Sequence, residues 1–311
     1  MNDEAPARPE KKAPRPPGPK SRWRRPLLAI LSLVALDQLL LWTCVTRPAG
    51  NIRDMIELTG DPTPPYFQLR RGAEASYTTW GRGVATGIHT NSLGFRDPER
   101  TPEQVAARAD GIRRVLIAGD SITFGIGVGD DEAFPRRLQA LLDERGNRDV
   151  EVWNTGVPAY SMADHLGLLR RRLLALKPDL IVLQLSRNDN ALPMPLGPTF
   201  LSSVRYSGFA RAWMIVRLNF VEDAPLFSAS FAAYVEECQR AGVKLLLVHE
   251  GLPEENRAEV LRLTTERAIP LVEIGGDAYP KLPDDPHYSP EGNRRVAERL
   301  YPEVLSALRA H

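Results

Sequence analysis

Short apolar runs alternate with amphipathic segments from about residue 113 to the end of the chain. The runs are rich in Val, Leu and Ile, as in strands covered on both faces, and the longer segments repeat apolar residues at helical spacing. This pattern predicts an α/β domain of three layers with a parallel central sheet. The predicted strands are Arg114–Ala118, Val150–Asn154, Leu180–Leu185, Lys244–His249 and Leu271–Ile274. The predicted helices are Ala133–Glu144, Met162–Leu176, Phe227–Ala241, Glu254–Ala268 and a last one that begins after Ser289-Pro290.

Residues 27–45 form a longer apolar run than any of these. As a helix the run spans roughly 28 Å, close to the hydrocarbon thickness of a bilayer, so we predict a single transmembrane anchor. Asp37 and Gln38 weaken this prediction, since an Asp at the centre of a helix costs about 2.5 to 3.5 kcal/mol on insertion into a membrane. A buried core helix and a cleavable signal peptide are the alternatives. No small-x-small cleavage site follows Val45, and Cys44 lacks the small-residue context of a lipoprotein.

The flanks of this run differ in charge. Residues 1–26 are rich in Pro and carry eight Lys and Arg against three acidic residues, which predicts a disordered basic tail. Positive charge stays on the cytoplasmic side, so we expect the tail in the cytoplasm and the rest in the periplasm or outside the cell. Residues 46–112 are predicted as a juxtamembrane lead-in with β-structure, and residues 113–311 as the α/β domain.

Composition excludes several function classes. The chain has 40 Lys and Arg against 39 Asp and Glu, so it lacks the basic excess that would indicate nucleic-acid binding. Its two cysteines, Cys44 and Cys238, form neither a disulfide framework nor a zinc motif. The glycines between Gly125 and Gly129 do not fit a dinucleotide loop, because acidic residues follow where a pyrophosphate would lie.

Candidate chemistry lies at the end of the first predicted strand. That strand runs into Gly119-Asp120-Ser121, which places Ser121 at the carboxyl edge of the sheet, where open α/β sheets bind ligands. A serine nucleophile needs a base and an acid that orients the base. The loop Asp284-Asp285-Pro286-His287 supplies both. His287 is the candidate base, and Asp284 is the candidate acid at its other ring nitrogen.

Four blocks in order resemble the SGNH hydrolases, also called GDSL esterases and lipases. The blocks are Gly119-Asp120-Ser121-Ile122, Asn154-Thr155-Gly156, Ser186-Arg187-Asn188-Asp189 and Asp284 to His287. The resemblance covers roughly residues 113–311 and implies a flavodoxin-like α/β/α fold. The third block usually begins with a glycine where this chain has Ser186.

The resemblance also implies a role for each block. The catalytic residues are then Ser121, Asp284 and His287, the oxyanion donors are the Ser121 N–H, the Gly156 N–H and the Asn188 amide, and Asp120 supports them. The spacing of the family selects Asp284 over Asp285. No metal and no organic cofactor is implied.

The expected function is a serine-dependent carboxylic ester hydrolase that acts outside the cytoplasmic membrane through an acyl-enzyme. Its expected substrates are small esters, lipids or acetylated glycans. An O-acyltransferase on surface polysaccharide and an inactive SGNH-like binding protein are the alternatives. The motif Asn91–Asp97 resembles the lead-in of membrane-tethered bacterial members, and Ala191–Pro225 is predicted as a lid or wall over the site.

Overall fold

The computed structural model of the chain describes residues 24–45, 55–78, 85–106, 110–191, 193, 209 and 223–310. The predicted basic tail, apart from residues 24–26, lies outside these described residues. Most of the predicted lid Ala191–Pro225 lies outside them as well.

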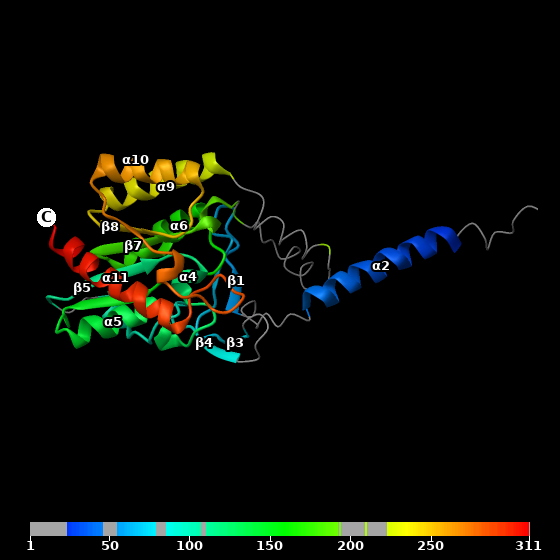
Figure 1. Cartoon of the computed structure of the whole chain (residues 1–311), viewed down its shortest axis with the longest axis horizontal. Coiled ribbons are helices and arrows are strands. Elements are labelled where there is room, and N and C mark those ends of the chain that lie inside the picture. Colours follow the sequence, from blue (N-terminus) through cyan, green and yellow to red (C-terminus); the bar gives the residue numbers. More distant parts are fainter. Residues whose placement is uncertain are drawn as a thin grey trace, which may run out of the picture.

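A five-stranded parallel sheet forms the centre of the molecule, in the order β6-β5-β7-β8-β9, and Figure 1 labels its three middle strands, β5, β7 and β8. The chain starts in β5, adds β6 on one side and then β7, β8 and β9 on the other, as in flavodoxin-like folds. The loop after β5 therefore lies at the switch point where such sheets bind ligands. The strands are β5 (Arg113–Ala118), β6 (Val150–Asn154), β7 (Leu180–Leu185), β8 (Lys244–His249) and β9 (Leu271–Glu273), each within one residue of its prediction at both ends.

Helices cover both faces of the sheet. Helices α5 and α11 pack against each other on one face, while α6, α9 and α10 cover the other (Figure 1). The predicted helix Met162–Leu176 is not uniform, because α6 gives way to a π-helical turn, η3 (Leu169–Leu173), and a 3-10 turn, η4 (Leu174–Leu176). The helices are α3 (Pro102–Ala106), α4 (Ser121–Phe124), α5 (Phe134–Glu144), α6 (Met162–Leu168), α9 (Ala224–Arg240), α10 (Glu254–Arg267) and α11 (Pro290–Arg309).

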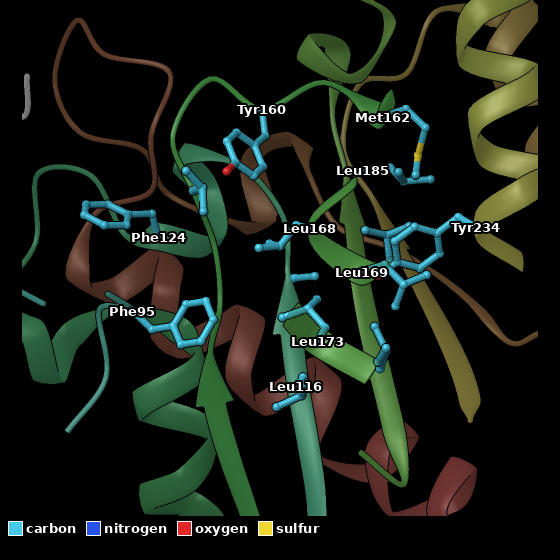
Figure 2. Packing of buried hydrophobic residues seen from close by; sticks show 14 of the residues in the cluster. Phe95, Leu116, Phe124, Tyr160, Met162, Leu168, Leu169, Leu173, Leu185 and Tyr234 are labelled. Carbon is cyan, nitrogen blue, oxygen red and sulfur yellow. The ribbon is translucent and has the colours of Figure 1, made fainter. Parts of the chain in front are cut away.

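The core consists of two apolar layers, one on each face of the sheet. Val115 and Ile117 of β5 belong to the layer under α5 and α11, and Leu116 belongs to the layer under α6 and α9. This alternation follows from the pleat, which points successive side chains to opposite faces. Figure 2 shows Leu116 in the second layer with Tyr160 and with Phe95 of the lead-in.

The lead-in is built into this core. Two antiparallel strand pairs form it: β1 (Ile56–Leu58) with β2 (Phe67–Leu69), and β3 (Glu74–Thr78) with β4 (Ala85–His89). Phe67 and Phe95 are buried in the α6 layer, and the Tyr160 hydroxyl donates to the Phe67 carbonyl over 2.6 Å. The predicted β-structure is thus present, and it shares one core with the α/β domain.

The N-terminal apolar run forms helix α2 (Arg24–Val45), whose side chains are described for residues 29–39. Six large apolar residues among them are exposed: Ile30, Leu31, Leu33, Val34, Leu36 and Leu39. Within the described residues, none of the helices combines the length and the apolar character that crossing a membrane requires. The predicted transmembrane span 27–45 is thus not found in the described part of the chain and stays a prediction.

Candidate active site

Ser121 begins the one-turn helix α4 directly after β5. Asp120 is the N-cap of this helix, and its Oδ1 accepts from the Ile122 N–H over 2.9 Å. Gly119 leaves room for the side chains of Thr123 and Gln184, since a Cβ there would lie 2.2 Å from Thr123 Oγ1 and 2.7 Å from Gln184 Oε1. The predicted strand-to-turn geometry therefore places Ser121 at the carboxyl edge of the sheet.

His287 lies against Ser121, as predicted. The distance from His287 Nε2 to Ser121 Oγ is 2.9 Å, although 166 positions separate the two residues in sequence. The loop that carries His287 is closed by the Leu282 N–H, which donates to the His287 carbonyl over 2.9 Å. The capped start of α11 follows, where Ser289 Oγ accepts from the Gly292 N–H.

The carboxylate at His287 is that of Asp285, which corrects the choice of Asp284. Asp285 Oδ1 lies 2.6 Å from His287 Nδ1 and also accepts from the His287 N–H over 2.9 Å. Asp285 is buried, whereas Asp284 is exposed and has a φ of 56°, so the turn directs the two neighbours apart. Burial acts to raise the pKa of Asp285, but the hydrogen bonds from His287 outweigh it and hold this pKa below its ordinary value.

Asp120 connects the first block to the third. Its Oδ2 accepts from Ser186 Oγ over 2.7 Å and from Asn188 Nδ2 over 3.0 Å. Ser186 has extended backbone angles, so this position does not need a glycine, and its hydroxyl adds a bond that a glycine cannot make. The substitution in the third block therefore preserves the loop, and Asn188 faces the same cavity as Ser121.

The second block does not bring Gly156 to this cavity. The Gly156 N–H donates to the Asn154 Oδ1 over 3.1 Å, and a Cβ on Gly156 would lie 2.6 Å from the Phe124 backbone nitrogen. Gly156 thus serves close packing behind α4. Three residues later Ala159 lines the cavity with a φ of 64°, and its N–H has no hydrogen-bond partner among the described residues.

A cavity of about 700 Å³ surrounds Ser121. Apolar side chains, among them Ile122 and Ile126, form one part of its wall, and an ion pair forms another, with Lys281 Nζ 2.5 Å from Glu250 Oε1. Tyr77 of the lead-in also lines it, and the Tyr77 hydroxyl lies 3.5 Å from Asp285 Oδ2. Among the described residues, no group of three or more His, Cys, Asp or Glu side chains is arranged to hold a metal ion.

The structure thus adds residues that the sequence motifs did not indicate. Asp285 lies in a block that was identified, but the choice between two adjacent acids depends on a turn conformation. Ala159 carries no motif signal, since alanine rarely adopts a positive φ. Tyr77 comes from a strand that is more than 40 residues before Ser121, and no local pattern joins the two.

A comparison with known protein families agrees with the four sequence blocks. A model of the GDSL-like lipase/acylhydrolase family matches residues 117–299, more than half of the chain. The match does not include the lead-in, so it does not support the membrane-tethered type that the resemblance implied. No curated protein matches the chain.

Solved structures match the chain at low sequence identity. TesA is 20% identical, with a TM-score of 0.48 and coverage of 63% of this chain and 99% of that one. The esterase EstA from Pseudoalteromonas sp. is 14% identical, with a TM-score of 0.47 and coverage of 64% and 100%. The acetyl xylan esterase AlAXEase is 20% identical, with a TM-score of 0.45 and coverage of 61% and 99%.

Proposed function

Because the chain belongs to the GDSL-like lipase/acylhydrolase family, whose members act on esters, we propose that it is a serine esterase that works through an acyl-enzyme. One observation carries this proposal. Ser121, His287 and Asp285 form a continuous series of hydrogen bonds at the wall of a cavity of about 700 Å³.

In this proposal each of the three residues has a role in ester hydrolysis. With the Nδ1–H of His287 donated to Asp285, Nε2 accepts the Ser121 proton while Oγ attacks the ester carbonyl. The protonated His287, stabilised by the Asp285 carboxylate, then passes that proton to the leaving alkoxide as the acyl-enzyme forms. Water activated by His287 attacks the acyl group, which releases the acid and restores Ser121.

The negative oxygen of the tetrahedral intermediate needs preorganised donors. We assign this role to the Ser121 N–H, the Asn188 amide and the Ala159 N–H. Ala159 replaces Gly156 in this assignment, because Ala159 lines the cavity and the Gly156 N–H is bonded to Asn154.

The cavity favours esters with a polar alcohol part. Ile122 and Ile126 offer an apolar surface to the acyl chain, while Glu250 and Lys281 offer an acceptor and a donor to hydroxyl groups. Such substrates include acetylated glycans and glycerol lipids, as well as small esters. A panel of acyl esters and acetylated glycans, assayed for released acid, tests this preference.

Labelling with a fluorophosphonate probe tests the mechanism. The wild-type chain should be labelled and should hydrolyse p-nitrophenyl acetate with a burst of p-nitrophenol. Ser121→Ala should abolish both while the circular dichroism spectrum is unchanged. Labelling of Ser121→Ala at the wild-type rate would exclude the assignment, and acyl transfer to an added glycan would identify a transferase instead.

We further propose that helix α2 anchors the catalytic part outside the cytoplasmic membrane. Two features support this: the apolar run of residues 27–45 and the exposure of its described apolar side chains. The full chain should sediment with membranes and resist alkaline carbonate extraction. A reporter enzyme fused after residue 311 should be active only outside the cytoplasm. Recovery of the full chain in the soluble fraction would refute the anchor.

A further inference from the structure

The motif Asn91–Asp97 folds into a tight turn beside the α/β domain. Asn91 Oδ1 accepts from the N–H groups of Leu93 and Phe95, each over 3.0 Å. Gly94 has a φ of 75°, and a Cβ there would lie 2.6 Å from the Leu69 carbonyl oxygen, so only glycine fits. Phe95 and Arg96 follow this turn, and both are only 1% exposed.

The buried guanidinium of Arg96 binds the segment that follows the nucleophile. Its Nη1 donates to the carbonyls of Phe124 and Gly125, and Nη2 donates to the carbonyl of Val128 over 2.6 Å. Its Nε donates to Asp130 Oδ1 over 2.8 Å. The guanidinium carbon also lies 5.1 Å from the centre of the Phe124 ring. Residues 124–130 therefore wrap around one buried cation.

These carbonyls belong to the end of the nucleophile helix. Phe124 is the last residue of α4 and Gly125 is its C-cap, with a φ of 86°. The N–H groups of Gly125 and Ile126 both donate to the Ser121 carbonyl, over 3.1 and 3.2 Å. Arg96 thus binds the carbonyl side of the same two peptide units whose N–H groups hold the Ser121 carbonyl. The same segment carries Ile126, which lines the cavity.

We propose that Arg96 is a positioning residue for Ser121, through the turn Phe124–Val128, and this inference rests on the proposed serine mechanism. The lead-in thereby forms part of the active site, because it supplies the group that fixes the nucleophile relative to His287. A guanidinium has five donors in a planar fork, so it satisfies three carbonyls and a carboxylate together. A lysine ammonium cannot reproduce that geometry.

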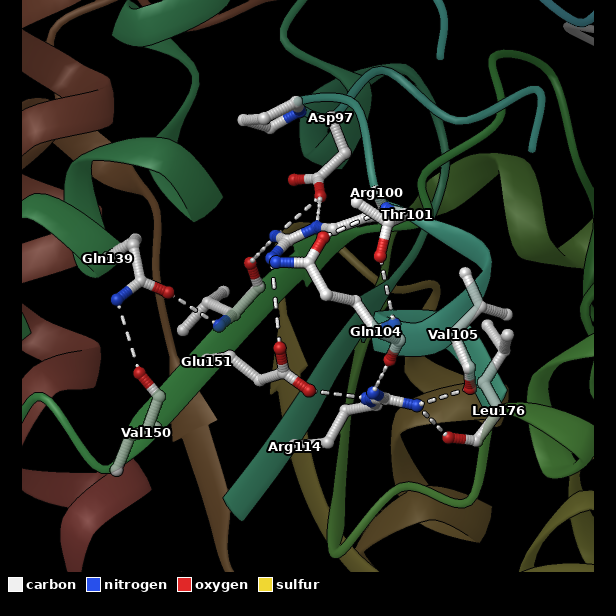
Figure 3. A network of polar contacts seen from close by, with 12 residues as sticks. Asp97, Arg100, Thr101, Gln104, Val105, Arg114, Gln139, Val150, Glu151 and Leu176 are labelled. Carbon is white, nitrogen blue, oxygen red and sulfur yellow. Dashed lines mark hydrogen bonds and ion pairs between the residues drawn. The ribbon is translucent and has the colours of Figure 1, made fainter. Parts of the chain in front are cut away.

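Arg114 offers a matched control at the other end of β5. It is also 1% exposed, binds the carbonyls of Gln104 and Leu176, pairs with Glu151 over 2.5 Å and lies 4.4 Å from the Trp153 ring centre (Figure 3). Both arginines therefore stabilise the fold through similar contacts. Only Arg96 contacts the segment that holds Ser121.

The test compares Arg96→Lys with Arg114→Lys in the full chain. Both variants should lower the urea midpoint of unfolding. Arg96→Lys should reduce the fluorophosphonate labelling rate per folded molecule, and the kcat for p-nitrophenyl acetate, about 10- to 100-fold, since small misplacements of reacting groups are costly. Its KM should stay within about threefold of wild type. Arg114→Lys should leave the labelling rate and kcat within about twofold.

A second variant keeps the proposal testable if Arg96→Lys does not fold. Asp130→Asn removes the charge paired with Arg96 Nε and, over 2.6 Å, with His89 Nδ1, and the Asp130 side chain is 38% exposed, so the fold should tolerate it. We expect a labelling rate about three- to tenfold below wild type. Wild-type rates in folded Arg96→Lys or in Asp130→Asn, or an equal loss in Arg114→Lys, would overturn the inference. Labelling of Ser121→Ala would instead overturn the serine mechanism, so the two failures are distinguishable.

Discussion

Asp284 and Asp285 are adjacent in one turn, yet only Asp285 is buried against His287. The turn places Asp284 in the left-handed region, with a φ of 56°, and leaves its carboxylate in solvent. Asp285 receives two hydrogen bonds from His287 and lies near the Tyr77 hydroxyl. Since an imidazole is oriented by the acid at its Nδ1, the geometry makes Asp285 the functional partner.

Replacing each acid in turn distinguishes the roles of Asp284 and Asp285 in catalysis. Asp285→Asn should lower kcat for p-nitrophenyl acetate by about 10³- to 10⁴-fold, because an amide at Nδ1 favours the wrong tautomer of His287. Asp284→Asn should keep kcat within about twofold. Steady-state kinetics on both variants checks this. A larger loss of kcat from Asp284→Asn than from Asp285→Asn would make Asp284 the functional acid.

At the scale of elements, the apolar pattern predicted every strand of the central sheet, because strands buried on both faces must be continuously apolar. The residues directly after β5 and β7 were placed correctly for the same reason: the carboxyl ends of parallel strands meet at one edge. The positions of residues in the longer loops are harder to predict from sequence. Which N–H faces the cavity after β6 depends on the φ of Ala159, and a backbone angle leaves no signature in alanine.

Helix α6 carries a buried acid that couples its stability to pH. Burial raises the pKa of Asp164 from 3.8 to about 6, against the hydrogen bonds from Ser161 and the charge of His165, while the charge of Asp189 adds to the rise. Between about pH 4 and pH 6 the unfolded chain releases this proton while the folded chain retains it. The free energy of unfolding therefore falls as pH rises through that window, by at most about 3 kcal/mol from this group.

Asp164→Asn removes the titration but retains an oxygen that accepts from Ser161. We expect the difference in unfolding free energy between pH 4 and pH 7 to shrink by up to about 3 kcal/mol relative to wild type. Urea unfolding at both pH values measures it. An unchanged difference would mean that Asp164 is ionised in the folded chain throughout this range.

At the scale of the whole molecule, close contacts between the lead-in and the α/β domain predict that the two unfold as one unit. Gly167 of α6 lies directly under the lead-in, where a Cβ would be 2.1 Å from the Pro64 carbonyl oxygen and 2.4 Å from Pro65 Cδ. Arg171 of η3 also donates to the Pro65 carbonyl over 3.1 Å. No local sequence pattern predicts such contacts, since they join segments about 100 residues apart.

Gly167→Ala tests whether the lead-in and the α/β domain unfold together. In an isolated helix the change favours folding by about 1 kcal/mol, so the sign of the effect depends on the contact with Pro64. Because backbone atoms must move, we expect the free energy of unfolding to fall by about 1 to 3 kcal/mol, in a single transition seen equally by far-UV circular dichroism and tryptophan fluorescence. Gly87→Ala is the control, since among the described residues its Cβ would meet only the His89 ring, at 3.5 Å, and it should be neutral. Two separate transitions, or a stabilised Gly167→Ala, would show that the lead-in is an independent unit.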